Sequence, residues 1–155
     1  MITAIIGKAG TGKSTIARIL STSYDECIEA DAMVKKAYEE QSTLDFFSRH
    51  TILYKALQGP SVDKSTLIQL LLDFPSAKLD LEDFLFQNYL LPSILASQLK
   101  GKSLLVDGIV PRFATHFEQV ITVEADDSIR QSNLRKRGVS EERIRELFDL
   151  QQTKS

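Results

Sequence analysis

The chain has 155 residues, of which 43% are hydrophobic, and this is enough for one domain with a single core. Its 19 basic and 21 acidic side chains leave a formal charge of -2, which excludes a uniformly basic surface for nucleic acid or membrane. One cysteine excludes an internal disulfide, and no apolar run approaches the about 18 residues of a membrane helix. Met1 begins no basic leader, so we expect a cytoplasmic protein. We also expect it to be a monomer.

The first apolar run leads directly into a glycine-rich segment. Residues 2–6 are typical of a buried strand, and residues 7–14 read G-K-A-G-T-G-K-S, the spacing of a P-loop. Glycines allow a tight turn whose amide N–H groups face phosphate oxygens, and a helix from about Ser14 adds its positive dipole end. The pattern predicts a nucleotide-phosphate site made of Gly7, Ala9, Gly10, Thr11, Gly12, Lys13, Ser14 and Thr15.

Two other interpretations of residues 7–14 compete with a P-loop. The first is a glycine-rich turn between a strand and a helix that binds no ligand. A dinucleotide fingerprint could begin at Gly10, with Asp31 near the distance expected for a ribose contact, but Thr15 occupies the place of its third glycine. Lys13 and Ser14 have a defined role only in a P-loop, so we favour phosphate binding.

Apolar runs alternate with helical patterns through the rest of the chain. Strands are expected at 27–30, 103–106 and 119–123. Helices are expected at 33–40, 61–74, 79–99, 128–136 and 140–152, with Pro92 interrupting the third of them. This alternation predicts an α/β fold of three layers with a parallel sheet, whose ligands lie at the carboxyl ends of the strands.

Two carboxylates follow predicted strands and would lie at that carboxyl edge. Asp107 is a candidate magnesium ligand beside the Ser14 hydroxyl, although an aspartate before Gly108 is also typical of a turn. Asp31 could accept a proton from a hydroxyl that attacks the γ-phosphate, or it could cap the next helix. The two roles of Asp31 are compatible.

Basic residues gather late in the chain around Gly138, at Arg130, Arg135, Lys136, Arg137, Arg143 and Arg145. In P-loop kinases such cations often lie on a mobile lid and stabilise the charge of the transferred phosphoryl group. The alternative is a solvated helix face. We predict a lid at 130–148 with Arg135 and Arg137 as catalytic cations. His50 and His116 lack companions at metal-ligand spacing and are expected to be structural or exposed.

Taken together, these features resemble the dephospho-coenzyme A kinase family over nearly the whole chain. Residues 28–31, I-E-A-D, are similar to the family's I-D-A-D segment, whose second aspartate is the catalytic base, and this implies that role for Asp31. Residues 89–94 are similar to the end of the family's helical substrate-binding insert and imply a substrate contact at Pro92, within an insert at 43–100. Residues 137–140, followed by Arg143 and Gln151, resemble the family's lid.

The chain departs from that family at several positions. Leu91 replaces a histidine, and the lid lacks the aspartate between Arg137 and Gly138. Residues 107–112, D-G-I-V-P-R, look more like the D-G-x-P-R of nucleoside monophosphate kinases, in which the arginine holds the acceptor's phosphate, so Arg112 is a candidate substrate contact. The chain ends at Ser155, before the family's fifth strand, so we expect four parallel strands in the order 2-3-1-4.

The resemblance implies a kinase that transfers the γ-phosphate of ATP, with Mg²⁺, to the ribose 3′-hydroxyl of dephospho-coenzyme A. Two alternatives remain beside it. One is a nucleoside monophosphate kinase-like phosphotransferase, favoured by residues 107–112. The other is a degenerate homologue that binds nucleotide without catalysis, favoured by the missing motif residues.

Overall fold

The computed structural model describes residues 1–152 of the chain. These residues divide into two compact units, which we describe separately. The first unit is made of residues 1–30 together with the chain from Pro92 onward, and the second is residues 31–91. The insert predicted at 43–100 overlaps the second unit.

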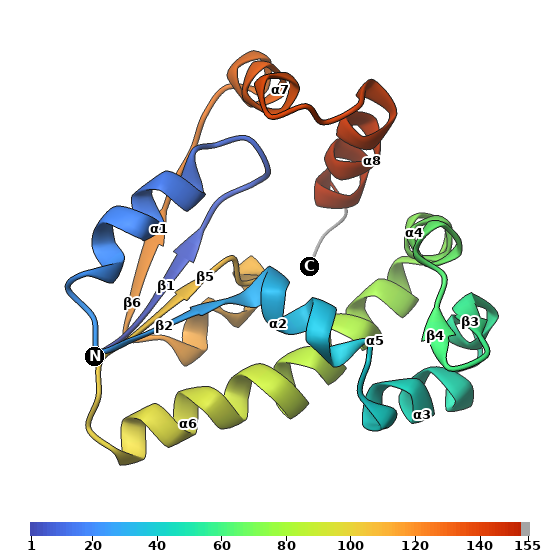
Figure 1. The fold of residues 1–155 in the computed structure, drawn as a ribbon, viewed down its shortest axis with the longest axis horizontal. Coiled ribbons are helices and arrows are strands. Elements are labelled where there is room, and N and C mark those ends of the chain that lie inside the picture. Colours follow the sequence, from blue (N-terminus) through green and yellow to red (C-terminus); the bar gives the residue numbers. More distant parts are fainter. Residues whose placement is uncertain (153–155) are drawn as a thin grey trace. The chain divides into compact units, whose positions relative to one another are not determined.

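A parallel sheet of four strands forms the centre of the first unit (Figure 1). The strands are β1 (Ile2–Ile6), β2 (Glu26–Glu29), β5 (Leu104–Asp107) and β6 (Gln119–Thr122). Their order across the sheet is β2-β5-β1-β6, and every neighbouring pair is parallel. Counted along the chain, this is the predicted order 2-3-1-4, so the expected α/β fold with a parallel sheet is confirmed.

The central strands are buried and the edge strands are not. Residues 2–5 of β1 and 104–106 of β5 are almost completely buried, because both faces of these strands are covered. β2 and β6 lie at the edges, and their residues are exposed or half-buried. The register sets the carboxyl ends level, since Asp107 is paired with Ile5 on one side and with Glu29 on the other. The segments that follow these strands therefore leave the sheet at one edge.

Four α-helices lie in the described part of the first unit. They are α1 (Lys13–Ser21), α6 (Leu91–Leu99), which begins at the unit boundary, α7 (Asp127–Lys136) and α8 (Glu141–Gln152). Ala17 of α1 packs against Ile5 and Leu105 of the sheet, with Leu20 and Tyr24 beside them. Gly138, with φ of 81°, lies in the turn between α7 and α8, where the sequence predicts a break.

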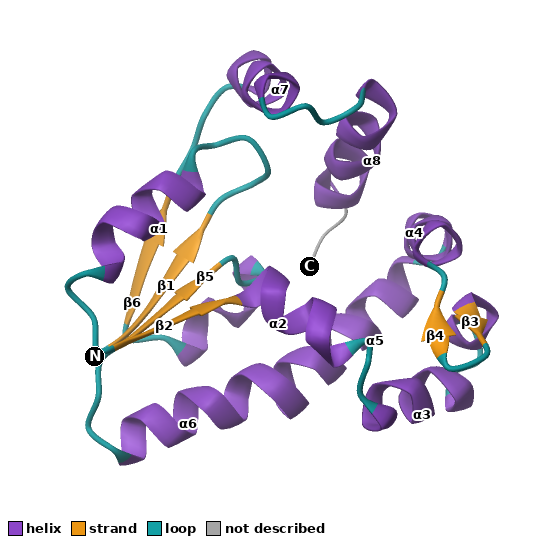
Figure 2. Ribbon diagram, in the orientation of Figure 1, coloured by secondary structure: helices purple, strands orange, loops and turns teal. Residues whose placement is uncertain are grey.

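The second unit is mainly helical (Figure 2). Its helices are α2 (Ala30–Ala37), whose first residue belongs to the first unit, α3 (Gln41–Arg49), α4 (Lys64–Asp73) and α5 (Pro75–Leu85). A 3₁₀ helix (Leu53–Ala56) follows α3. Its buried core consists of Phe47, Leu53, Ala56, Leu67, Leu70, Ala77 and Leu81. Within residues 1–152, no helix has the length and apolar character needed to cross a membrane.

The helix predicted at 61–74 begins later than the sequence suggests. Ser61–Val62 instead forms a short strand, β4, antiparallel to β3 (Leu57–Gln58), and Gly59 with φ of 57° lies in the turn between them. α4 then starts at Lys64, because the Asp63 carboxylate accepts a hydrogen bond from the Thr66 N–H at 3.1 Å. Hydrogen bonds from the Thr66 hydroxyl and from its N–H, together with one from the Ser65 hydroxyl, lower the pKa of Asp63.

The interruption predicted at Pro92 is also present, in a different form. A π-helix (Phe86–Leu90) separates α5 from α6, and Pro92 is the second residue of α6. Proline has no N–H to donate and its ring crowds the preceding turn, so a regular α-helical pattern cannot run through it. The wider π turn directly before the proline is the local adjustment to this constraint.

Tyr38 carries the clearest pH dependence of the second unit. Burial beside Phe47, at 6.1 Å between ring centroids, raises the pKa of its phenol to about 12. Because an unfolded tyrosine titrates near pH 10, the stability linked to this proton is complete below pH 10 and is lost as the pH rises through about 12. We expect a loss of about 2–3 kcal/mol over that range. Urea unfolding at pH 8 and 11.5 will show a smaller alkaline loss for Tyr38→Phe than for wild type, whereas equal losses would contradict the assignment.

Candidate active site

The loop Gly7–Ser14 connects the carboxyl end of β1 to α1, as a P-loop requires. Gly10 and Gly12 have φ of 82° and 85°, in the left-handed region that glycine adopts without strain. A tight turn precedes Gly12, because the N–H and the hydroxyl of Thr11 both donate to the carbonyl of Lys8, at 3.3 and 2.9 Å. Gly12 is the N-cap of α1, so the loop runs directly into the helix N-terminus.

Two of these glycines are also required by close packing. A Cβ on Gly10 would lie 2.4 Å from the carbonyl oxygen of Arg130. A Cβ on Gly7 would lie 2.8 Å from the hydroxyl of Thr11 and 3.1 Å from the carbonyl of Val123. The loop is therefore packed against neighbouring backbone and has no space for larger residues at these two positions.

Lys13 and Asp107, predicted from opposite ends of the chain, form an ion pair in the first unit. The ammonium Nζ of Lys13 donates to the Oδ1 of Asp107, and their side chains are only 16% and 14% exposed. Lys13 begins α1, and Asp107 ends β5 at the carboxyl edge of the sheet. Gly108 lies against the same ammonium, where a Cβ would come 3.4 Å from Nζ. The predicted phosphate cation and the predicted acid thus share one site.

Ser14 and Asp107 are the predicted magnesium ligands. Ser14 is the second residue of α1 and is exposed, next to the lysine that contacts Asp107. A hydroxyl and a carboxylate are ligands suited to Mg²⁺, which takes few protein oxygens and keeps several waters. In the described part of the chain, no three His, Cys, Asp or Glu side chains gather into a metal site made of protein groups alone. The donor set fits an ion that is shared with nucleotide phosphates, and the assignment stays a prediction.

Asp31, the predicted base, is the second residue of α2 and is exposed. It follows the end of β2 by two residues, and Glu29 at that end is paired in register with Asp107. A carboxylate in the first turn of a helix is favoured by the helix dipole, although Asp31 lies inside the helix and not at the N-cap position. Its catalytic role stays a prediction, as does the substrate contact predicted at Pro92, at the start of α6.

The arginines of the predicted lid occupy different environments. Arg135, near the end of α7, makes a two-point contact with Glu141 at the start of α8, and its Nη2 lies 3.2 Å from Oε2. Hydrogen bonding from Arg135 lowers the pKa of Glu141, and the same bond raises the pKa of the guanidinium. Arg137 caps the end of α7 and is exposed. The Arg135 guanidinium would have to leave Glu141 to reach a phosphate.

Arg130 belongs to the same predicted cluster but is only 4% exposed. Its Nε donates to the carbonyl of Ala9 at 2.8 Å, and Asn133 donates to the carbonyl of Gly10 at 2.8 Å. The sequence analysis did not identify Asn133. Asn133 is three residues from Arg130, so both side chains lie on one face of a helix. This spacing was the only sequence feature that could have pointed to Asn133.

Arg112, the predicted phosphate contact of an acceptor, lies in a 3₁₀ helix (Pro111–His116) that follows β5. Its guanidinium carbon is 4.3 Å from the centroid of the Phe113 ring, a distance suited to a cation–π contact. Arg112 is half-buried, and Phe113 is buried. The residue is in the first unit, a few positions after Asp107, as its motif predicts.

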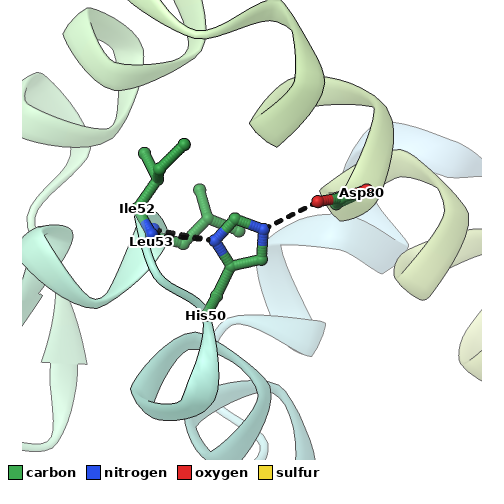
Figure 3. Close-up of polar contacts among 4 residues, drawn as sticks. All are labelled: His50, Ile52, Leu53 and Asp80. Atoms are coloured by element: carbon green, nitrogen blue, oxygen red, sulfur yellow. Dashed lines mark hydrogen bonds and ion pairs between the residues drawn. The ribbon is translucent and has the colours of Figure 1, made fainter.

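His50 is structural, as expected, since both of its ring nitrogens have partners (Figure 3). Nδ1 accepts from the N–H groups of Ile52 and Leu53, each at 3.1 Å, so the ring proton of the neutral form is on Nε2. Nε2 then donates to the Asp80 carboxylate at 2.8 Å. The imidazole thus links the end of α3 to the turn that follows it and to Asp80 of α5, within the second unit.

Comparisons with known proteins agree with this fold. A sequence model of the AAA domain family matches residues 4–154. Among solved structures, TT1252 from Thermus thermophilus is 18% identical with a TM-score of 0.73, and the match covers 100% of this chain and 80% of that protein. The identity of this match is low enough that it shows the fold alone.

Two kinases of known activity match with lower scores. Dephospho-CoA kinase from Campylobacter jejuni is 19% identical with a TM-score of 0.46, covering 97% of this chain and 79% of that one. Shikimate kinase from Acinetobacter baumannii is 12% identical with a TM-score of 0.42, covering 96% and 73%. No curated protein sequence matches the chain significantly. On the family match and the fold, the chain belongs to the AAA domain family and has a P-loop kinase-like fold.

Proposed function

We propose that this protein is a kinase that transfers the γ-phosphate of ATP to the ribose 3′-hydroxyl of dephospho-coenzyme A. The observation that carries the phosphotransferase part is the Lys13–Asp107 ion pair beneath the P-loop. An ammonium and a carboxylate, both largely shielded from water, lie at the carboxyl edge of the parallel sheet, where folds of this class bind ligands. Nucleotide phosphates would draw the Lys13 ammonium away from Asp107, which would leave the carboxylate available to hold magnesium.

Each residue has a part in this proposal that follows from its chemistry. Lys13 and the loop amides hold the β- and γ-phosphates, and Ser14 and Asp107 hold magnesium. Magnesium would supply positive charge that offsets the charge of the phosphate oxygens. Asp31 orients the attacking hydroxyl and accepts its proton. Arg135 and Arg137 stabilise charge that spreads over the transferred phosphoryl group.

The choice of acceptor is supported by the sequence. The I-E-A-D segment ending at Asp31 resembles the dephospho-coenzyme A kinase pattern and leads into a mainly helical unit of the kind that family uses for its substrate. Pro92 follows at the end of that unit. The helical unit would therefore bind the acceptor, with its hydroxyl at Asp31.

A specific observation favours a second candidate, a nucleoside monophosphate kinase. Arg112 follows Asp107 in a D-G-x-P-R-like segment and is held over Phe113. A guanidinium fixed in this way can form two parallel hydrogen bonds to a phosphate. Under this candidate the acceptor group would be a 5′-phosphate and not a hydroxyl, and Asp31 would have no proton to accept.

A panel of acceptors with γ-labelled ATP separates these candidates. The panel contains dephospho-coenzyme A, AMP, CMP, UMP, dAMP and shikimate, and Lys13→Met assayed in parallel excludes contaminating kinases. We expect label in the 3′-phosphate of coenzyme A and in no other product. Label in a nucleoside diphosphate would favour the second candidate, and Mg-ATP binding without label transfer to any acceptor would identify a non-catalytic homologue.

A further inference from the structure

Helix α7 contacts the P-loop through two side chains that lie one helical turn apart. The Nε of Arg130 donates to the carbonyl of Ala9, and the Nδ2 of Asn133 donates to the carbonyl of Gly10, each at 2.8 Å. The backbone of Arg130 is also in contact with Gly10, since a Cβ there would lie 2.4 Å from its carbonyl oxygen. Figure 1 shows α7 beside the loop that joins β1 to α1.

These two bonds set the direction of the loop's amide groups. The peptide bonds of the described chain are trans, so the C=O and the following N–H of each peptide point in opposite directions. A carbonyl of Ala9 held toward α7 therefore directs the N–H of Gly10 away from α7. The carbonyl of Gly10, held by Asn133, fixes the N–H of Thr11 in the turn, where it donates to the carbonyl of Lys8 at 3.3 Å. An N–H group held in a fixed direction, such as that of Gly10, is what such a loop offers to an anion.

Arg130 is itself held too firmly to act as a mobile lid cation. It is 4% exposed, and its Nη1 donates to the Asp127 carboxylate at 2.9 Å. The guanidinium carbon lies 4.0 Å from the centroid of the Phe148 ring of α8. These contacts occupy the guanidinium along its edge and on one face. The Arg130 side chain thus links α8, α7 and the P-loop within the first unit.

We propose that Arg130 and Asn133 are positioning residues that hold the P-loop amides in the orientation that binds phosphate. Neither residue contacts the nucleotide in this proposal, which rests on the proposed function of the loop as a phosphate site. A loop that is already oriented before binding loses less conformational entropy when the ligand binds. The two residues therefore raise the affinity of the loop for the phosphate chain. Phe148 supports Arg130, and α8 therefore contributes to phosphate affinity indirectly.

The test uses Arg130→Met, Asn133→Ala and a matched control, Arg18→Met. Arg18 is exposed on α1, and its replacement removes the same charge as Arg130→Met without a contact to the loop carbonyls. The first measurement is hydrogen–deuterium exchange by mass spectrometry without nucleotide. We expect about tenfold faster exchange at the amides of residues 9–12 in both test variants, with exchange in β1 and β5 unchanged. A general loss of stability would accelerate all of these segments together.

The second measurement is the Kd of Mg-ATP and of inorganic tripolyphosphate by calorimetry. We expect about tenfold weaker binding of both ligands in each test variant and wild-type binding in the control. Wild-type exchange and binding in both test variants would overturn the inference. If Arg130→Met fails to fold, the exchange and binding measurements on Asn133→Ala alone test the inference. If the wild-type protein bound neither ligand, the proposed function would be overturned. The exchange measurement would still test whether Arg130 and Asn133 hold the loop.

Discussion

Replacing Lys13 with methionine will reduce kcat/KM for phosphoryl transfer about 10²- to 10³-fold and weaken Mg-ATP binding. The ammonium is a compact charge that follows the β- and γ-phosphates into the transition state, and methionine keeps the apolar stem without that charge. The substitution also leaves the Asp107 carboxylate, only 14% exposed, without its cation. Steady-state kinetics with saturating acceptor and calorimetric titration with Mg-ATP measure the two effects.

Two further variants show whether the Lys13 effect is specific. Lys100→Met removes an equal charge from an exposed position after α6 and should retain wild-type kinetics. Asp107→Asn keeps the shape of the partner and removes its charge, so we expect its KM for magnesium to rise. If Lys13→Met retains more than about a third of wild-type kcat/KM, the proposal that the activity depends on phosphate binding by this loop is wrong.

Replacing Asp31 with asparagine will reduce kcat about 10²- to 10⁴-fold and leave the Kd of Mg-ATP unchanged. Asparagine retains one oxygen for orienting the acceptor hydroxyl but cannot accept its proton. The loss should be a kcat effect, because the interaction develops as the hydroxyl loses its proton. Single-turnover measurements with preformed enzyme–ATP complex separate this chemical step from product release.

Glu39→Gln is the matched control for Asp31→Asn. Glu39 is an exposed carboxylate of the same helical unit, just after α2, and no role in the site is assigned to it. Its variant should behave as wild type in kinetics and in thermal unfolding. Full single-turnover rate in Asp31→Asn would remove Asp31 as the base, while label transfer to dephospho-coenzyme A would still support the kinase.

The strands and most helices of this protein are predictable from local pattern. Each buried strand is a short apolar run ended by a polar or glycine residue, so β1 and β5 lie within a residue of their predicted bounds. Where a helix starts is less predictable, since the apolar pattern before α4 extends into β4. Pairing of β3 with β4 and capping by Asp63 decide that boundary, and both involve residues outside the periodic pattern.

The candidate site shows the same division. The P-loop with its lysine and serine and the positions of the four strands follow from the sequence by itself, because glycine spacing and buried runs are local properties. The order of the four strands was expected from the family resemblance and not from a local pattern. Only the tertiary structure decided that Lys13 pairs with Asp107, and that Arg130 and Asn133 hold the loop carbonyls and not a phosphate. These residues lie about a hundred positions apart in the chain, and a side chain's partner depends on which surfaces the parallel sheet and its helices bring together.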